Sequence, residues 1–241
     1  MKLLLIRHGD PDYKLDSLTP RGVKEAELLA ERMADVPIDK IYVSPQGRAQ
    51  RTAEYTLQKK QMTAETLPWL CEFGYPIEMP PEARKPNSRI VWNLYPSFCQ
   101  TVPDLYDPEK WLQVDFIKGS VIPEKYKMVC DSLDALLAKH GYVREGMFYR
   151  VERANIDTIA VFCHCGLSLI VLSHLFNMAP LPLLQHFGCP PSSVTTVVTE
   201  ERQKGIAQFR CACYGSTEHL YVGNTEPSPA GLFDQTFRDE K

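Results

Sequence analysis

Two histidines, His8 and His164, each follow an apolar run that is typical of a buried strand. Arg7 precedes the first of them, and Arg48 falls in the first turn of an expected helix. Guanidinium groups bind phosphate oxygens through paired hydrogen bonds, and a neutral imidazole is a nucleophile toward phosphorus. Open α/β sheets bind ligands at the carboxyl ends of their strands, so this set predicts phosphoryl transfer. Arg7-His8-Gly9 by itself is equally compatible with the start of a solvated loop.

A carboxylic acid completes such a site by protonating the departing alkoxide. Glu72 is the candidate, because it follows an expected strand over residues 63–70. Glu65 and Glu78 are the alternatives, and any of the three also reads as a solvated loop carboxylate. Cationic side chains already neutralise the transferring group, so the set predicts a reaction without a metal or other cofactor.

The residues after His164 open an apolar helix, and the amide groups of Cys165 and Gly166 would face the remaining negative charge. A thiol beside the phosphate would make activity sensitive to oxidation, unless Cys165 packs as a small apolar group. Zinc is the other hypothesis for Cys163, His164 and Cys165. Alternate residues of a strand point to opposite faces, so one metal would not reach all three. The pair Cys211 and Cys213 lacks a two-residue spacer as well, which favours buried thiols.

Composition excludes several classes of partner. The chain has 241 residues, with 27 basic and 30 acidic side chains and a net charge of -3. Such a balance gives no electrostatic footprint for nucleic acid or for an anionic membrane. The apolar run at residues 3–6 is too short for a signal peptide, and no stretch approaches a membrane span. The eight scattered cysteines are therefore expected to be free thiols in a reducing cytoplasm.

Strand-like runs alternate with helix-like segments, which predicts an α/β fold with helices on both faces of a mostly parallel sheet. Between residues 73 and 123 this alternation lapses into a segment rich in prolines and aromatics. Aromatic content argues against disorder there, and prolines argue against long elements. We therefore expect one catalytic domain over 1–241 with 73–123 as an inserted, substrate-selecting cap.

Five short motifs occur in one order along the chain. They are Arg7-His8-Gly9, Leu18-Thr19-Pro20-Arg21-Gly22, Ser44-Pro45-Gln46-Gly47-Arg48-Ala49 with Thr52-Ala53, Glu72, and His164-Cys165-Gly166. Together they resemble the histidine phosphatase superfamily, in its phosphoglycerate mutase-like branch, over residues 1–72 and about 155–220. The resemblance implies a three-layer α/β/α sandwich.

The resemblance also implies a role for each matching residue. His8 would become phosphohistidine, Arg7, Arg48 and His164 would clamp the phosphoryl oxygens, and Glu72 would be the proton donor and later the general base. His219 resembles a histidine of the family's closing loop, where it would support the pocket or serve only the structure.

Mutases of this family carry a Ser and an Asn soon after Arg-His-Gly, whereas this chain has Asp10-Pro11-Asp12. Two carboxylates there would repel a second phosphate, which favours a phosphatase over a mutase or a weakly catalytic phospholigand-binding module. The expected partner is a small phosphate ester. The cap's aromatics and its basic residues (Arg84, Lys85, Arg89, Lys110 and Lys118) suit a nucleotide, a sugar phosphate or a phosphopeptide equally. No oligomeric state is predicted.

Overall fold

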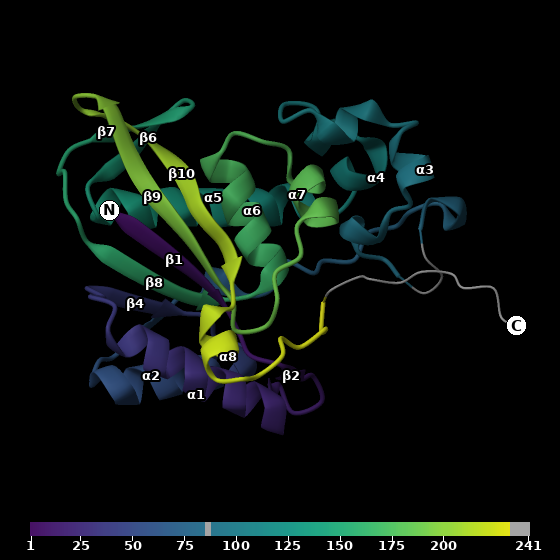
Figure 1. Cartoon of the computed structure of the whole chain (residues 1–241). Coiled ribbons are helices and arrows are strands. Elements are labelled where there is room, and N and C mark those ends of the chain that lie inside the picture. The colour runs from purple at the N-terminus through teal and green to yellow at the C-terminus, as the bar shows by residue number, and fades with distance from the viewer. Residues whose placement is uncertain (85–87, 232–241) are drawn as a thin grey trace, which may run out of the picture.

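The computed structural model describes residues 1–84 and 88–231. Its centre is an eight-stranded sheet with the strand order β5-β4-β8-β1-β9-β10-β7-β6 (Figure 1). The strands are β1 (Lys2–Arg7), β4 (Lys40–Val43), β5 (Glu65–Thr66), β6 (Tyr142–Glu145), β7 (Phe148–Val151), β8 (Thr158–Cys163), β9 (Val194–Gln203) and β10 (Ile206–Ser216). A small separate hairpin joins β2 (Pro11–Asp12) to β3 (Ser17–Leu18).

The parallel half of the sheet carries the most apolar strands. β1 and β4 both pair with β8 in parallel, and every residue of β8 is buried. Strands covered on both faces need apolar side chains at every position, which explains their continuous apolar runs. β9 pairs antiparallel with β1, and β10 with β9. The structure thus confirms the predicted α/β sheet, in which the strands from β9 to β6 pair antiparallel.

Local chemistry explains where the strand prediction over 63–70 was wrong. Only Glu65–Thr66 pairs with β4, and Pro68–Leu70 forms a 3₁₀ turn, η1. Proline has no N–H to donate to a sheet ladder, so pairing ends before Pro68.

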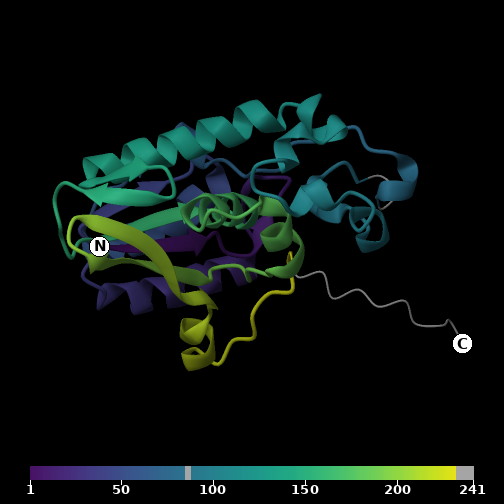
Figure 2. The ribbon, with the colours of Figure 1, turned by 90° about the horizontal axis from the view of Figure 1, so that it is seen from above.

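Two helical layers cover the sheet. On one face, Leu4 and Ile6 of β1 pack with α1 (Pro20–Ala34) and α2 (Gly47–Lys60). On the other, Leu3 and Leu5 share a core with α5 (Ile122–Lys139), α6 (Cys165–Leu175) and α7 (Pro180–His186). Figure 2 shows these layers from above. Helix α6 is buried along nearly its whole length, because it lies between the sheet and the segment that follows Glu72.

The segment from 73 to 121 consists of short elements around a core of its own that merges with the core of α5 and α6. Its buried side chains include Val91, Leu94, Cys99, Leu105 and Trp111. The elements are η2 (Pro81–Ala83), η3 (Val91–Asn93), α3 (Pro96–Cys99), η4 (Pro103–Tyr106), η5 (Trp111–Gln113) and α4 (Asp115–Lys118). Of the basic residues expected here, Lys85 lies outside the described residues.

After β10 the chain forms α8 (Glu218–Val222) and then returns toward the end of β1, where Ala230 contacts Arg7. Over the described residues, no helix combines the length and apolar character that crossing a bilayer requires.

Candidate active site

His8 leaves β1 in a turn that packs closely under the start of α1. Its backbone N–H donates to the Cys163 carbonyl of β8 at 3.0 Å, and Gly9 N–H donates to Thr52 Oγ1 at 2.9 Å. A side chain at Gly9 would place its Cβ 2.7 Å from the Gly22 carbonyl oxygen. The glycines of two separate motifs therefore meet, which explains why both positions lack a side chain.

The hydrogen bonds of His8 define which ring nitrogen is free. Nδ1 lies 2.7 Å from the Gly9 carbonyl oxygen, which can only accept, so Nδ1 carries the proton. Nε2 then presents its lone pair, to which Arg48 Nε donates at 3.3 Å. Burial, together with the charge of Arg7, lowers the pKa of His8 to about 3. The imidazole is neutral at pH 7 and is a competent nucleophile.

His164 lies beside it, with the two ring centroids 5.1 Å apart. Ser44 Oγ accepts from Gln46 N–H at 3.2 Å and lies 2.8 Å from His164 Nε2. A hydroxyl both donates and accepts, so this contact is compatible with the ring proton on either nitrogen of His164. Nδ1 is buried and has no partner among the described residues. Burial also lowers the pKa of His164, so the ring is neutral at pH 7.

Arg48 comes from the first turn of α2, and a residue that sequence reasoning missed holds it. Asp16 Oδ1 accepts from Arg48 Nη1 at 2.6 Å, and Asp16 Oδ2 accepts from Gly47 N–H at 2.6 Å. Gln46 Oε1 accepts from Arg48 Nη2 at 3.3 Å. A Cβ at Gly47 would lie 2.2 Å from the Asp16 carbonyl oxygen, so glycine there lets the loop approach. Gly47, directly before Arg48, is the one feature of the sequence that could have indicated so close an approach by another loop.

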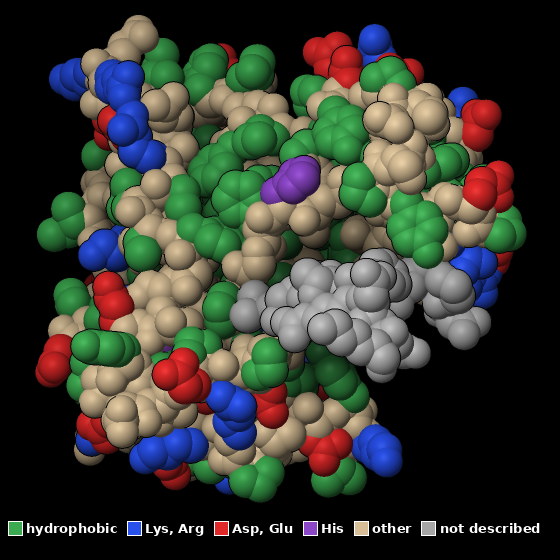
Figure 3. Space-filling view, turned by 45° about the vertical axis from the view of Figure 1, so that its right-hand side comes forward, with side chains coloured by type: hydrophobic (Ala, Val, Ile, Leu, Met, Phe, Trp, Pro, Cys, Tyr) green, Lys and Arg blue, Asp and Glu red, His purple; other side chains and the backbone are tan. Residues whose placement is uncertain are grey.

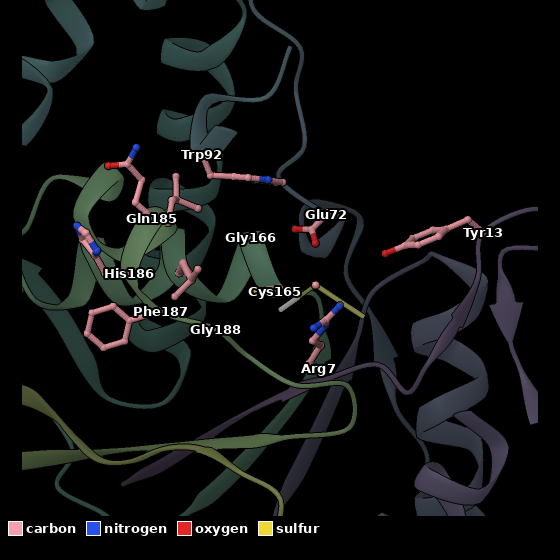
Figure 4. A pocket seen from close by; sticks show the side chains of 13 residues that line it. Arg7, Tyr13, Glu72, Trp92, Cys165, Gly166, Gln185, His186, Phe187 and Gly188 are labelled. Carbon is pink, nitrogen blue, oxygen red and sulfur yellow. The ribbon is translucent and has the colours of Figure 1, made fainter. Parts of the chain in front are cut away.

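The Glu72 side chain lies beside the start of α6, although Glu72 itself follows η1. Its Oε1 accepts from the backbone N–H groups of Phe73 at 2.8 Å and Leu167 at 2.9 Å. Its own N–H donates to Gln46 Oε1 at 2.8 Å, which links Glu72 to the segment that carries Arg48. Figure 4 shows Glu72 and Arg7 near Cys165 at one cavity. The carboxylate is thus held beside the arginines by backbone donors.

The two alternative acids lie elsewhere. Glu65 pairs with Lys40 at 3.3 Å on the outer strand of the sheet, and Glu78 pairs with Arg89 and is 81 % exposed. Neither lines the cavity. Of the three candidates, only Glu72 lines this cavity and contacts the first turn of α6, the helix that directly follows His164.

Arg7, Cys165 and Gly166 line the same cavity. Arg7 Nη1 donates to the carbonyls of Cys189 and Ala230, and the latter distance is 2.9 Å. A hydrogen bond to Cys189 and burial raise the pKa of the Cys165 thiol. The same contact lowers the pKa of the Cys189 thiol to about 7, and Cys165 itself packs against the core beside α5 and α6.

The zinc hypothesis fails on side-chain direction. Cys163 Sγ lies 3.3 Å from Ser168 Oγ, whereas Cys165 lines the cavity and His164 Nε2 contacts Ser44 Oγ. Within the described part of the chain, no group of three or more His, Cys, Asp or Glu side chains converges as metal ligands would.

The carboxylates expected to repel a second phosphate do not line the cavity, which corrects that argument. Asp10 accepts from the hydroxyls of Thr19, at 2.6 Å, and of Ser228. Asp12 Oδ1 accepts from the N–H of Lys14 at 2.9 Å. Both carboxylates therefore stabilise the loop. His219 does not line the cavity; its Nε2 lies 3.0 Å from Ser192 Oγ, and the Ser192 N–H donates to the His8 carbonyl at 3.0 Å, so His219 supports the loop that backs His8.

Comparisons with known proteins agree with this geometry. Residues 3–85 match the family model of the histidine phosphatase superfamily (branch 1). Adenosylcobalamin/alpha-ribazole phosphatase of Escherichia coli is 33% identical over 84 residues, which are 31% of this chain and 41% of that protein. Phosphoserine phosphatase 1 of Hydrogenobacter thermophilus is 23% identical over 89% of this chain and 94% of its own length.

Solved structures share the fold over nearly the whole chain. Phosphoserine phosphatase of Entamoeba histolytica, in a mutant complex with phosphoserine, has a TM-score of 0.59 at 20% identity and covers 91% of this chain and 98% of its own. Mycobacterial glucosyl-3-phosphoglycerate phosphatase has a TM-score of 0.58 at 15% identity, covering 89% and 99%. Residues 3–85, which carry the first matched motifs, are thus similar to the histidine phosphatase superfamily, and nearly the whole chain shares the fold of the solved phosphatases named above.

Proposed function

We propose that this chain is a phosphomonoesterase that acts through a phosphohistidine intermediate on His8. One observation carries the proposal: a buried imidazole, neutral at pH 7, points its unprotonated Nε2 at the Arg48 guanidinium. In water a free nucleophile would have no such partner for the phosphoryl group. Here the Arg48 cation lies next to the nucleophilic Nε2 of His8, where it can bind the phosphoryl oxygens while Nε2 attacks phosphorus.

The reaction balances with the residues at hand. His8 Nε2 attacks phosphorus, a P–N bond forms, the P–O ester bond breaks, and Glu72 gives its proton to the leaving oxygen. Glu72 then takes a proton from water, the water oxygen attacks phosphorus, and the P–N bond breaks. Inorganic phosphate leaves and both groups return to their starting states.

Charge on the transferring group is balanced by the protein itself. Arg7 and Arg48 supply two guanidinium groups, the His164 tautomer with its proton on Nδ1 supplies an N–H, and the start of α6 supplies backbone dipoles. We propose that these groups make a metal ion unnecessary. Turnover should therefore persist at full rate in excess chelator, and strong inhibition by chelator would contradict this part of the proposal.

Hydrolysis is favoured over mutase activity, because a mutase must also hold a second phosphate. Among the described residues that line the cavity, Arg7 is the only arginine or lysine. The relatives named above are also phosphatases. Interconversion of phosphoglycerates in the presence of a bisphosphate activator, at a rate above hydrolysis, would overturn this preference.

The first test is His8→Ala assayed with p-nitrophenyl phosphate. Loss of the nucleophile should reduce kcat by at least about 10³-fold while the thermal unfolding transition is retained. His174→Gln is the matched control, because His174 bonds Asp134 at 2.9 Å and lies outside the cavity.

Rapid quenching of the wild type should also recover one acid-labile phosphoryl group on the peptide that contains His8. Turnover retained by the His8→Ala variant would contradict the mechanism. Detectable binding without turnover of any ester would instead indicate a phospholigand-binding module.

We further propose that residues 73–123 form the substrate-selecting part of this single domain. The contact between η3 and α7 beside the cavity supports that proposal. The eight free thiols accord with the cytoplasmic location predicted above.

A further inference from the structure

The cavity extends well beyond the residues that would hold phosphate. It has a volume of about 290 Å³. Arg7 and Glu72 lie at its phosphate end. Trp92 begins beside Glu72, at Gly166, and the other apolar lining side chains are Leu169, Leu184 and Phe187. A phosphoryl group fills only the first part, so the apolar part is available to the alcohol of the ester.

This outer part is poor in charge. Gln185, which also lines it, is already engaged, because its amide nitrogen donates to the Leu94 carbonyl at 3.2 Å and its oxygen accepts from the Tyr106 hydroxyl at 3.3 Å. No lysine, and no arginine besides Arg7, is among the described lining residues. In the space-filling view hydrophobic side chains gather on this face, with the Lys and Arg side chains toward its edges (Figure 3).

The consequence for a charged alcohol is unfavourable. A carboxylate on the leaving group would enter beside Glu72, where the described lining has no lysine and no arginine other than Arg7, which the phosphoryl group engages; the remaining basic side chain, His186, lies exposed at the α7 side. Burying an unpaired carboxylate costs far more than burying a neutral group of the same size. An uncharged leaving group avoids that cost.

Trp92 gives this part of the cavity a flat wall. It lies on η3, between Val91 and Leu94, whose buried side chains anchor the turn in the core. Its ring reaches over the start of α6, so close that a Cβ at Gly166 would lie 2.9 Å from its Cζ3. Phe187, which is 43% exposed, lies at the α7 side. Aromatic side chains bind flat rings through stacked and edge contacts.

We propose, on the basis of the phosphatase activity proposed above, that the substrate is a phosphomonoester of an uncharged, ring-bearing alcohol. Trp92 is the residue that selects it. Phosphate esters of carboxylate-bearing alcohols, such as phosphoserine and 3-phosphoglycerate, are disfavoured because the described part of the lining offers no lysine and no second arginine to pair with the carboxylate.

Turnover tests the selection directly. The kcat/KM for phenyl phosphate and for a nucleoside 5′-monophosphate should exceed that for phosphoserine by at least about tenfold. Glycerol phosphate, uncharged in its alcohol but without a ring, should fall between them. A wild type that turns over phosphoserine as well as phenyl phosphate would overturn the proposal.

Trp92→Ala separates ring recognition from a merely structural role. The ratio of kcat/KM for phenyl phosphate to that for glycerol phosphate should fall about tenfold, and Trp92→Phe should recover most of it. Trp69→Ala is the matched control, since Trp69 is also half-buried but lies outside the cavity, and it should leave the ratio unchanged. An unchanged ratio in Trp92→Ala would overturn the role of Trp92.

Binding keeps this inference separate from catalysis. The dissociation constant of phenylphosphonate, which has no ester bond to hydrolyse, should be about tenfold below that of methylphosphonate for the wild type. The difference should vanish in Trp92→Ala. Preferential binding without any turnover would refute the proposed activity alone, whereas turnover with equal affinities would refute the ring-binding site alone.

Discussion

The Arg48 guanidinium has two anionic partners: the Asp16 carboxylate and, in the proposed reaction, the phosphoryl group. The Arg48 side chain is 9% exposed and that of Asp16 is 47% exposed. Partial burial raises the pKa of Asp16, but the Gly47 N–H and the Arg48 guanidinium outweigh it and hold that pKa below its usual range. Asp16 is therefore ionised at neutral pH and fixes the fork of Arg48 toward His8.

Asp16→Ala is expected to lower kcat/KM for an aryl phosphate about tenfold, because the released guanidinium must be reordered in the transition state. Asp16→Asn keeps an acceptor oxygen and should give a smaller loss. Steady-state kinetics on both variants provide the measurement. A rise in kcat/KM would show instead that Asp16 competes with the substrate for Arg48.

The start of α6 is the element on which three parts of the molecule converge. Gly166 lies there between Glu72 and Trp92, and a Cβ at this position would be 2.8 Å from Glu72 Oε1. That distance is shorter than any relaxed contact, so a side chain would displace the carboxylate or the indole. One glycine thus lets the acid and the ring wall approach the same helix end.

Gly166→Ala should lower kcat/KM by roughly 10²-fold, because a displacement near 1 Å at a catalytic group has that order of effect. Its melting temperature should change little, since alanine is the better helix former at the same time. Gly119→Ala is the control, because a Cβ there meets only the Asp115 carbonyl oxygen at 3.4 Å. Full activity in Gly166→Ala would mean that Glu72 is not positioned as proposed.

For the molecule as a whole, buried histidines make stability depend on pH. Burial lowers the pKa of His219 to about 4, whereas an unfolded histidine titrates near 6.5. Between those values the unfolded chain binds more protons, so stability is complete above pH 6.5 and is lost as pH falls toward 4. His8, with a pKa of about 3, acts in the same direction.

On going from pH 7 to pH 5, His219 should contribute a loss of about 2 kcal/mol in the free energy of unfolding. Glutamine places an amide near the position of Nε2, so His219→Gln should keep the contact with Ser192 and remove that loss. Urea unfolding of both proteins at the two pH values gives the difference, in which all other titrating groups cancel. Equal losses in the two proteins would contradict a neutral, buried His219.

Much of the fold and of the site follows from local patterns. The apolar runs at residues 3–6 and 158–163 require strands buried on both faces, and they end at the two histidines. The structure brings His8, Arg48 and His164 together, and Gln46 links Glu72 to them, because its Oε1 accepts from both Arg48 and the Glu72 N–H. The strand predictions succeed because burial on both faces leaves a continuous apolar run in the sequence.

Only the tertiary structure decided the rest. Asp10 and Asp12 were predicted to face a second phosphate, yet Thr19, Ser228 and the backbone of Lys14 engage them. Asp16 meets Arg48, and Trp92 meets Gly166 at the cavity, through contacts between segments far apart in the chain. Side-chain direction in loops follows from such long-range packing rather than from a repeat, so neither the carboxylate on Arg48 nor the ring wall was predictable from spacing.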